Sequence, residues 1–482
     1  MSERVPGSRG LATVRVAVGT VIAAAALVGA AALVLLPLPG LAREDGVSVA
    51  AHPPASASVA TCVGPIIAAG RDASRAAQLT DAAAPALTAA AMSDGQTTDA
   101  TRSTLAAPDV TGGIGATALR ALPNGGAPAD VAAAASAQVS AEDLSGFVAS
   151  SCTRAEMESW LVGGSGSTGA SDLVILTNPG EVAARVTITV YGAEGGAVPV
   201  AGNNIVVAAG SQRVIPLASL AIGEENPVLR VTSSQAPVRA ALQASLTRVL
   251  VPGGVDQVGA TAVPDTDLVI PGVPVVTTQG GAGESNVPTS LRLLSPGADA
   301  QATVTVLQGG AAVGAAQTVP LIAGVPLKLD LGGLATGTYA VRVSATAPVT
   351  GAVWATSGFG AGSDFGWFAA TDELSAPALV AVAAGPAAGA APQGPTLTLV
   401  SSDGEPQTAV LAAGGATGAK TDVAVPGTGS VTVPVRPGEV YLIDPGAGSV
   451  HAAVTYAAAG AIAGYPVEPS ASAASAVTVY PR

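Results

Sequence analysis

The sequence predicts a mainly β protein in which an N-terminal transmembrane helix is followed by a disulfide-stapled domain and tandem immunoglobulin-like β-sandwich modules. Three observations support this prediction. The 482-residue chain contains 60 Gly and 36 Pro, a composition that favours short strands joined by many turns. Residues 16–36 form an apolar run without a charged side chain. A strand–turn–strand pattern then recurs along the chain after Trp160.

The composition also limits the function. Charged residues make up 11% of the chain and hydrophobic residues 49%, a balance that allows a packed core and argues against disorder. The net charge is −13, and the segments after residue 36 contain no cluster of Lys and Arg. Because binding to a phosphate backbone needs such a cluster, we expect no nucleic-acid partner.

The apolar run predicts one membrane crossing. As a helix, residues 16–36 would span about 32 Å, against a hydrocarbon core of about 30 Å. Arg4, Arg9 and Arg15 precede the run, so the positive-inside rule makes residues 1–15 a cytoplasmic tail. We therefore expect a single-pass protein of the cell membrane, with the bulk of the chain extracellular and the membrane as a partner through residues 16–36.

Two other readings of the N-terminus stay open. Residues 40–42, Gly-Leu-Ala, resemble a signal-peptide cleavage site, although the apolar region of a signal peptide is usually shorter than this run. Residues 59–62, Val-Ala-Thr-Cys, faintly resemble a lipoprotein signal, but Thr61 stands where Gly or Ala is expected.

After the apolar run, residues 37–60 read as an extended spacer, and residues 61–162 as a membrane-proximal domain stapled by a disulfide. Cys62 and Cys152 are the only cysteines, and an extracellular pair with no third partner is expected to be bonded, with Cα atoms about 5 to 6 Å apart. The fold between them is hard to read. Residues 130–144 allow a helix, whereas both ends of the segment are strand-like.

The repeat predicts three modules, over residues 163–272, 273–385 and 386–482. The motif LVILTNPG at residues 173–180 returns as LRLLSPG at 291–297 and, more weakly, as LTLVSSDG at 397–404. A strand of alternating Thr and Val or Ile follows in the first two copies, as expected of a half-buried strand. About seven short strands in roughly 105 to 120 residues suit an immunoglobulin-like sandwich. We expect the modules to stack as a rod, and those without cysteine to be indifferent to reductant.

These features together resemble a known family, actinobacterial membrane-anchored extracellular proteins of unknown function. The resemblance lies in the N-terminal anchor, TCVGP at residues 61–65, SCTRAEMESWLVGG at 151–164 and the LVILTNPG strand. It covers most of residues 60–480. The resemblance implies an envelope location and supplies no known activity or catalytic residues.

No motif predicts a catalytic or metal site. His52 and His451 are the only histidines and lie far apart in the sequence, so they suggest neither a metal cluster nor a catalytic triad, and we expect no cofactor. GGSGS at residues 163–167 misses the G-x-S-x-G spacing of a nucleophile elbow and reads as a flexible junction. Asp256 and Asp364 follow the last strands of separate modules and read as turn-capping residues.

The Gly-rich stretch at residues 358–368 holds the only candidate ligand-binding side chains, Phe365, Trp367 and Phe368. They read either as an aromatic platform for a sugar or peptide, or as packing between modules, the role also expected of Trp160 and Trp354 in their own cores. We therefore expect a non-catalytic, membrane-anchored extracellular scaffold or adhesion-type protein of the cell envelope, with envelope proteins or glycans as partners. The alternative is an accessory glycan-binding protein in cell-envelope polysaccharide assembly; an enzyme ranks third.

Overall fold

The computed structural model of the chain is mainly β, as predicted, with 57% of residues in strands and 4% in helices. It describes residues 18–28, 49–51, 55–70, 77–93, 95–124, 128–248, 250–281, 283, 285, 287–386, 394–415, 417–470 and 477–479. The chain divides into two compact units, one of residues 1–54 and 475–482 and the other of residues 55–474.

In the first unit, a helix covers residues 18–28. The short strand β1 (Val49–Ala51) pairs antiparallel with β36 (Val477–Val479), the last strand of the chain that the structure describes. The other residues of the predicted span 16–36 lie outside the described residues, as does the predicted tail 1–15. Among the described residues, no helix is long and apolar enough to cross a membrane.

In the second unit, module 1 consists of two sheets around one core. Its strands are β11 (Glu158–Val162), β12 (Leu173–Asn178), β13 (Ala184–Gly192), β14 (Gly195–Ala197), β15 (Ile205–Val207), β16 (Ser211–Pro216), β17 (Val228–Ser234), β18 (Arg239–Arg248) and β19 (Val251–Val258). One sheet has the order β16-β12-β18-β19 and the other β11-β17-β13-β14, with β15 also on β13. Val186 and Ile188 of β13 and Leu176 of β12 share the core cluster, so the alternating strand buries the face that its period-2 pattern predicts.

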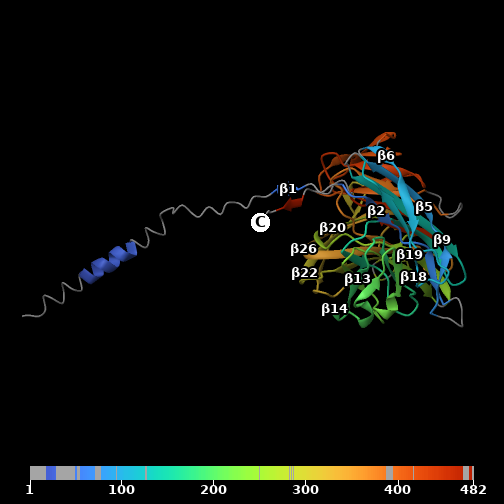
Figure 1. The fold of residues 1–482 in the computed structure, drawn as a ribbon, viewed down its shortest axis with the longest axis horizontal. Helices are drawn as coiled ribbons and strands as arrows, with labels where there is room; N and C mark the ends of the chain where they lie inside the picture. The colour runs from blue at the N-terminus through green and yellow to red at the C-terminus, as the bar shows by residue number, and fades with distance from the viewer. Residues whose placement is uncertain are drawn as a thin grey trace, which may run out of the picture. The chain divides into compact units, whose positions relative to one another are not determined.

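Modules 2 and 3 repeat this strand order, with β26 (Gly337–Thr356) taking part in both sheets of module 2. Figure 1 shows the strands of the second unit gathered in one body. Module 2 consists of β20 (Asp265–Val275), β21 (Thr289–Leu294), β22 (Ala300–Gln308), β23 (Ala311–Ala312), β24 (Gln317–Leu321), β25 (Leu327–Asp330), β26 (Gly337–Thr356) and β27 (Phe365–Ala369). Module 3 consists of β28 (Ala378–Ala381), β29 (Thr396–Ser401), β30 (Gln407–Ala413), β31 (Lys420–Val425), β32 (Ser430–Pro434), β33 (Val440–Asp444), β34 (Val450–Ala458) and β35 (Ala461–Pro466). The repeated motif is β12, β21 and β29, which occupy the same place in their sheets.

The first strand of a module lies earlier than the repeat suggests. β11 lies before residue 163, the expected start of module 1, yet it pairs with β17 of that module. Likewise β20 begins before residue 273, the expected start of module 2, and pairs with β26 of that module. The sequence landmarks begin at the second strand of each module, so the first strand carries no repeated motif that would assign it.

The N-terminal module consists of β2 (Ser58–Thr61), β3 (Ile66–Ala69), β4 (Leu79–Ala83), β5 (Ala86–Ser93), β6 (Gln96–Thr98), β7 (Ala100–Thr104), β8 (Thr117–Ala121), β9 (Ala129–Ser140) and β10 (Ser145–Ser151). Its sheets have the orders β10-β9-β5-β6, β2-β8-β7 and β3-β4. The segment that allowed a helix, residues 130–144, contains β9 instead. Pairing of β9 with both β5 and β10 overrides the helix propensity of its alanines.

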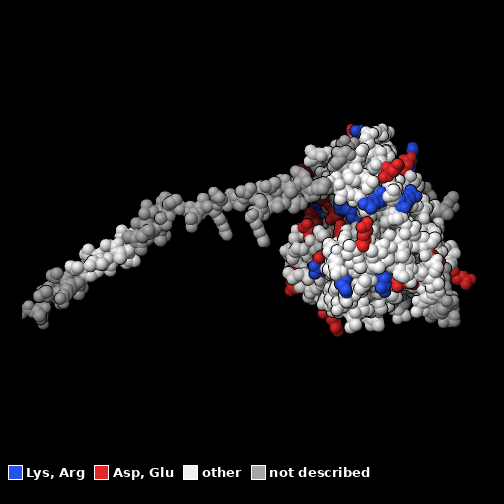
Figure 2. Space-filling model, in the orientation of Figure 1, with Lys and Arg blue, Asp and Glu red and all other residues white. Residues whose placement is uncertain are grey.

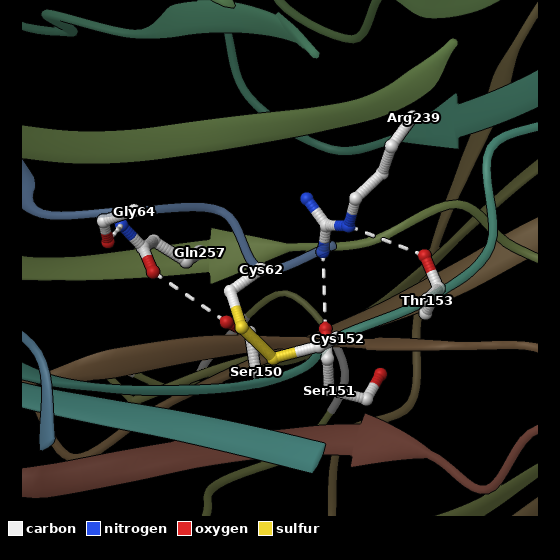
Figure 3. The surroundings of a disulfide bond; sticks show 8 residues. All are labelled: Cys62, Gly64, Ser150, Ser151, Cys152, Thr153, Arg239 and Gln257. Carbon is white, nitrogen blue, oxygen red and sulfur yellow. Dashed lines mark hydrogen bonds between the residues drawn. A yellow bond between two sulfur atoms is a disulfide. The ribbon is translucent and has the colours of Figure 1, made fainter. Parts of the chain in front are cut away.

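Cys62 and Cys152 form the predicted disulfide (Figure 3). Their Cα atoms are 4.0 Å apart, closer than we expected. The reason is the backbone: Thr61 and Thr153 exchange two N–H···O bonds, which places the two cysteines opposite each other in an antiparallel pair without hydrogen bonds, where Cα atoms approach most closely. Arg239 of module 1 donates from Nη2 to the Ser151 carbonyl (3.1 Å) and from Nε to Thr153 Oγ1 (3.2 Å). The stapled segment is therefore fastened to module 1.

The four modules do not form the expected rod. The last strands of the four modules, β10, β19, β27 and β35, contact one another in a closed cycle, here called the central ring. Each strand of the central ring places apolar side chains in the core of the next module: Val255 in the N-terminal module, Phe147 in module 3, Ile462 in module 2, and Phe365 and Trp367 in module 1. The ring covers four sheet edges that a rod would leave exposed.

Candidate functional site

A cleft of about 370 Å³ lies between modules 1 and 2. Its volume falls within the range of small-molecule sites. Its aromatic lining residues are Trp354, Phe359, Phe365 and Trp367, and its charged ones are Asp172, Glu225, Arg248, Arg292 and Lys328. Figure 2 shows one face of the molecule, on which acidic and basic side chains lie among mostly uncharged residues. The cleft combines four aromatic rings with three cations.

The accessible aromatic surface of the cleft belongs to Trp354 and Phe359, both of which are partly exposed. Their rings stack with centroids 6.0 Å apart and planes 25° apart. The Arg248 guanidinium carbon lies 4.1 Å from the Phe359 centroid, within the range of a cation–π contact. Neither Trp354 nor Phe359 was among the predicted ligand-binding residues.

The three predicted candidates are instead packing residues. Phe365, Trp367 and Phe368 are 3%, 7% and 3% exposed. Phe365 and Trp367 lie in the core of module 1, although they belong to module 2, and Phe368 lies in the core of module 2 itself. Phe365 and Trp367 therefore provide packing between modules, the other interpretation of this stretch. Phe365 and Trp367 form only the floor of the cleft.

Arg292 of β21 holds the module 1 side of the cleft in place. Its Nη1 donates to the carbonyl oxygens of Gly163 (3.0 Å), Gly164 (3.0 Å) and Pro227 (2.8 Å), and its guanidinium carbon lies 4.5 Å from the Trp367 centroid. Burial lowers the pKa of Arg292 to about 9, so the side chain remains a cation at neutral pH. Its Nε forms no hydrogen bond within the described residues.

Asp172 orders the GGSGS segment from the other side. One carboxylate oxygen accepts from Ser165 N (2.6 Å) and the other from Ser245 N (2.8 Å). Burial raises the pKa of Asp172 to about 7, against the lowering effect of these bonds and of Arg292. Gly164 has φ +67°, and a Cβ there would lie 2.8 Å from Asp172 Oδ2. The segment is thus a specific turn packed against Asp172 and Arg292, where the sequence suggested a flexible junction.

Asp256 lies in β19 of the central ring and Asp364 directly precedes β27; among the described residues their carboxyl groups accept hydrogen bonds from residues of the ring strands, where the sequence suggested turn capping. Asp364 Oδ2 accepts from Phe147 N (3.1 Å) and Ile462 N (3.1 Å), and Oδ1 accepts from Val255 N (3.3 Å), so one carboxyl group joins module 2 to the other three modules. Asp256 accepts from Trp367 N (2.7 Å). Both side chains are fully buried, and Asp256 lies near enough to raise the pKa of Asp364, after the larger effect of burial. Their separation in sequence hid this proximity.

The remaining candidates offer less chemistry. His451 is largely buried, and its Nδ1 lies 2.9 Å from the Thr371 carbonyl oxygen, while His52 lies outside the described residues. Glu156, Asp372 and Glu468 gather with two arginines around a cavity of only about 40 Å³, which has room for water but not for a substrate. A hollow of about 550 Å³ between modules 2 and 3 is lined by no charged or aromatic side chain.

Comparison with known families decides the affiliation of the chain. A family of unknown function, DUF5719, matches residues 107–436. The chain belongs to this family. No curated protein matches this DUF5719 chain. The matched region contains the whole cleft and three strands of the central ring, whereas β35 lies beyond it.

One signal in the DUF5719 sequence would have pointed to the cleft. Arg292 stands within an apolar strand of the repeat, at the position where β12 has Ile175 and β29 has Thr398. An arginine in a strand with buried neighbours needs hydrogen-bond partners. The repeat alignment therefore marks Arg292 as a side chain with a special role.

Proposed function

We propose that this DUF5719 protein is a non-catalytic, membrane-anchored extracellular protein of the actinobacterial cell envelope that binds a saccharide in the cleft between modules 1 and 2. One observation carries the proposal: the cleft exposes stacked aromatic rings beside hydroxyl, amide and cationic groups. Of the two functions that the sequence suggested, this favours the accessory glycan-binding protein over the scaffold.

The composition of the cleft suits a sugar. A pyranose ring has one face of C–H groups and an edge of hydroxyls, so it needs both a flat apolar surface and hydrogen-bond partners. Trp354 and Phe359 supply the surface, while Ser165, Ser167 and Asn226 line the same cleft. All of these groups are carried by modules locked together by the central ring, so the site is preformed.

The test is the affinity of Trp354→Ala for oligosaccharides. The full chain in detergent is titrated with neutral and acidic tetrasaccharides while heat release is measured. We expect Trp354→Ala to weaken binding about tenfold, since one stacked ring contributes about 0.5–1.5 kcal/mol in addition to the apolar area that it buries. Val200→Ala, which truncates a 97% exposed side chain outside the cleft, is the matched control and should bind like the wild type. Trp367→Ala is unsuitable because Trp367 is buried in the core of module 1.

A scaffold or adhesion role is the second candidate, and the central ring supports it. Four modules joined through shared cores make a stiff body that suits the display of surfaces to other envelope components. If the wild type binds no saccharide and captures envelope proteins equally well with or without the Trp354→Ala change, the scaffold role replaces the saccharide proposal.

The proposed location rests on the apolar run at residues 16–36 and on the disulfide, which needs an oxidising compartment. A thiol reagent applied to the intact protein under non-reducing conditions should label neither Cys62 nor Cys152. Labelling of both would contradict the extracellular assignment.

A further inference from the structure

We propose that the cleft selects an acidic saccharide, with the sugar stacked on Trp354 and Phe359 and its anionic group bound by Arg248 and Lys328. This rests on the proposed saccharide function and adds the charge class of the ligand. The anion is a carboxylate or a phosphate, since both match the chemistry of these two cations.

The first observation is a local reversal of charge. The chain has a net charge of −13, yet the cleft gathers Arg248, Arg292 and Lys328 against Asp172 and Glu225. Asp172 is buried and engaged by two backbone N–H groups, so among the lining acids only Glu225 is exposed to a ligand. A region of opposite sign to the whole molecule attracts anions from the solvent.

The second observation is that the two exposed cations have no anionic partner in the part of the chain that the structure describes. Among the residues that the structure describes, neither Arg248 nor Lys328 forms an ion pair. Arg292 is different, because its guanidinium already donates hydrogen bonds to backbone carbonyl oxygens of module 1. Arg248 and Lys328 are therefore the groups left to bind a ligand.

The third observation is where these cations lie. Arg248 packs on Phe359, which itself stacks with Trp354, so a sugar on the aromatic surface would have the guanidinium beside it. Lys328 of β25 is the cross-strand neighbour of Arg292 on β21 and lines the same cleft from module 2. One cation from each module thus faces the space where a saccharide would bind.

The experiment compares ligands that differ only in charge. The full chain in detergent is titrated by calorimetry with tetragalacturonate, with its methyl ester, and with a tetrasaccharide of uncharged sugars that carries one phosphate. We expect tetragalacturonate to bind at least tenfold more tightly than the ester, and this preference to shrink at higher salt. The phosphorylated ligand identifies the source of the anion: tighter binding than tetragalacturonate assigns a phosphate, and weaker binding assigns a uronate.

Single substitutions test the residues. Arg248→Gln and Lys328→Gln are each expected to lower the affinity for tetragalacturonate about fivefold to tenfold and to leave the affinity for the ester unchanged. Lys420→Gln removes the only other lysine, which is exposed on β31 of module 3, and should have no effect. Circular dichroism verifies that each variant is folded. Equal affinity for acid and ester overturns the charge inference and leaves the saccharide proposal intact, whereas binding of no saccharide overturns both.

Discussion

Replacing Asp364 by alanine tests whether the central ring stabilises the whole molecule. This carboxyl group accepts hydrogen bonds from backbone N–H groups of β10, β19 and β35. Its loss therefore leaves one buried N–H donor unpaired in each of the three other modules. An unpaired buried donor costs about 1–3 kcal/mol, and three of them about 6 kcal/mol at the middle of that range.

Part of this loss is offset because the variant no longer buries a carboxyl group. Burial raises the pKa of Asp364 well above its ordinary value of 3.8, so the native state is stabilised by protonation. The net destabilisation expected for Asp364→Ala is therefore smaller than the full sum, about 3–6 kcal/mol, the lower limit being three unpaired donors at about 1 kcal/mol each.

The assay is urea unfolding at pH 5, followed by tryptophan fluorescence and circular dichroism. The wild type should unfold in one transition because the module cores are shared, and Asp364→Ala should unfold at lower urea and in separate steps. Asp422→Ala, at an exposed position of β31, is the matched control and should change the free energy of unfolding by less than about 0.5 kcal/mol. A loss below about 1 kcal/mol for Asp364→Ala, with one transition preserved, would refute the proposed role of the ring.

Three further predictions follow from the same structure. Reduction of the Cys62–Cys152 disulfide, which closes a loop over a sequence separation of 90, should cost up to about 4 kcal/mol and lower the single thermal midpoint of the protein, because Arg239 fastens the stapled segment to module 1. Burial raises the pKa values of Asp172 and Asp256 from 3.8 to about 7, so the native state binds their protons more tightly than the unfolded chain. The resulting stabilisation is complete below about pH 4 and is lost towards pH 7, so the urea midpoint should be higher at pH 5 than at pH 8; a flat profile would contradict it. Gly164→Ala should weaken saccharide binding and also lower the urea midpoint, because Gly164 has φ +67° and a Cβ there would lie 2.8 Å from Asp172 Oδ2 and 2.9 Å from Leu217 Cδ2 in the core of module 1; unchanged saccharide affinity would contradict it.

The strands of each module could be predicted from the sequence because the pattern that marks them lies within a few consecutive residues. Period-2 alternation in residues 187–190 and 303–306 reports which face of a strand is buried, and the turn residues around it limit the strand length. The same local reasoning failed for β9, whose alanines have no strand preference of their own and become a strand only through pairing with β5 and β10.

The contacts between modules could not be predicted from the sequence, because an apolar side chain carries no information about which module's core it enters. Phe365 and Trp367 allowed two interpretations, a ligand platform or packing between modules, and the sequence did not show that the core they complete is that of module 1. A usable signal was present: β27 is apolar without alternation, which is typical of a strand buried on both faces. The cleft residues Trp354 and Phe359 carry no such signal, since their exposure depends on the angle between two modules.

The closed cycle of shared cores fixes the number of modules. In an open array each repeat touches only its neighbours, so evolution can lengthen or shorten the array by one copy and leave the other interfaces intact. Here, deleting any copy would leave one module without the side chains that complete its core and another with apolar side chains that have no core to enter. Natural relatives that share the ring should therefore differ in loop length but retain all four copies.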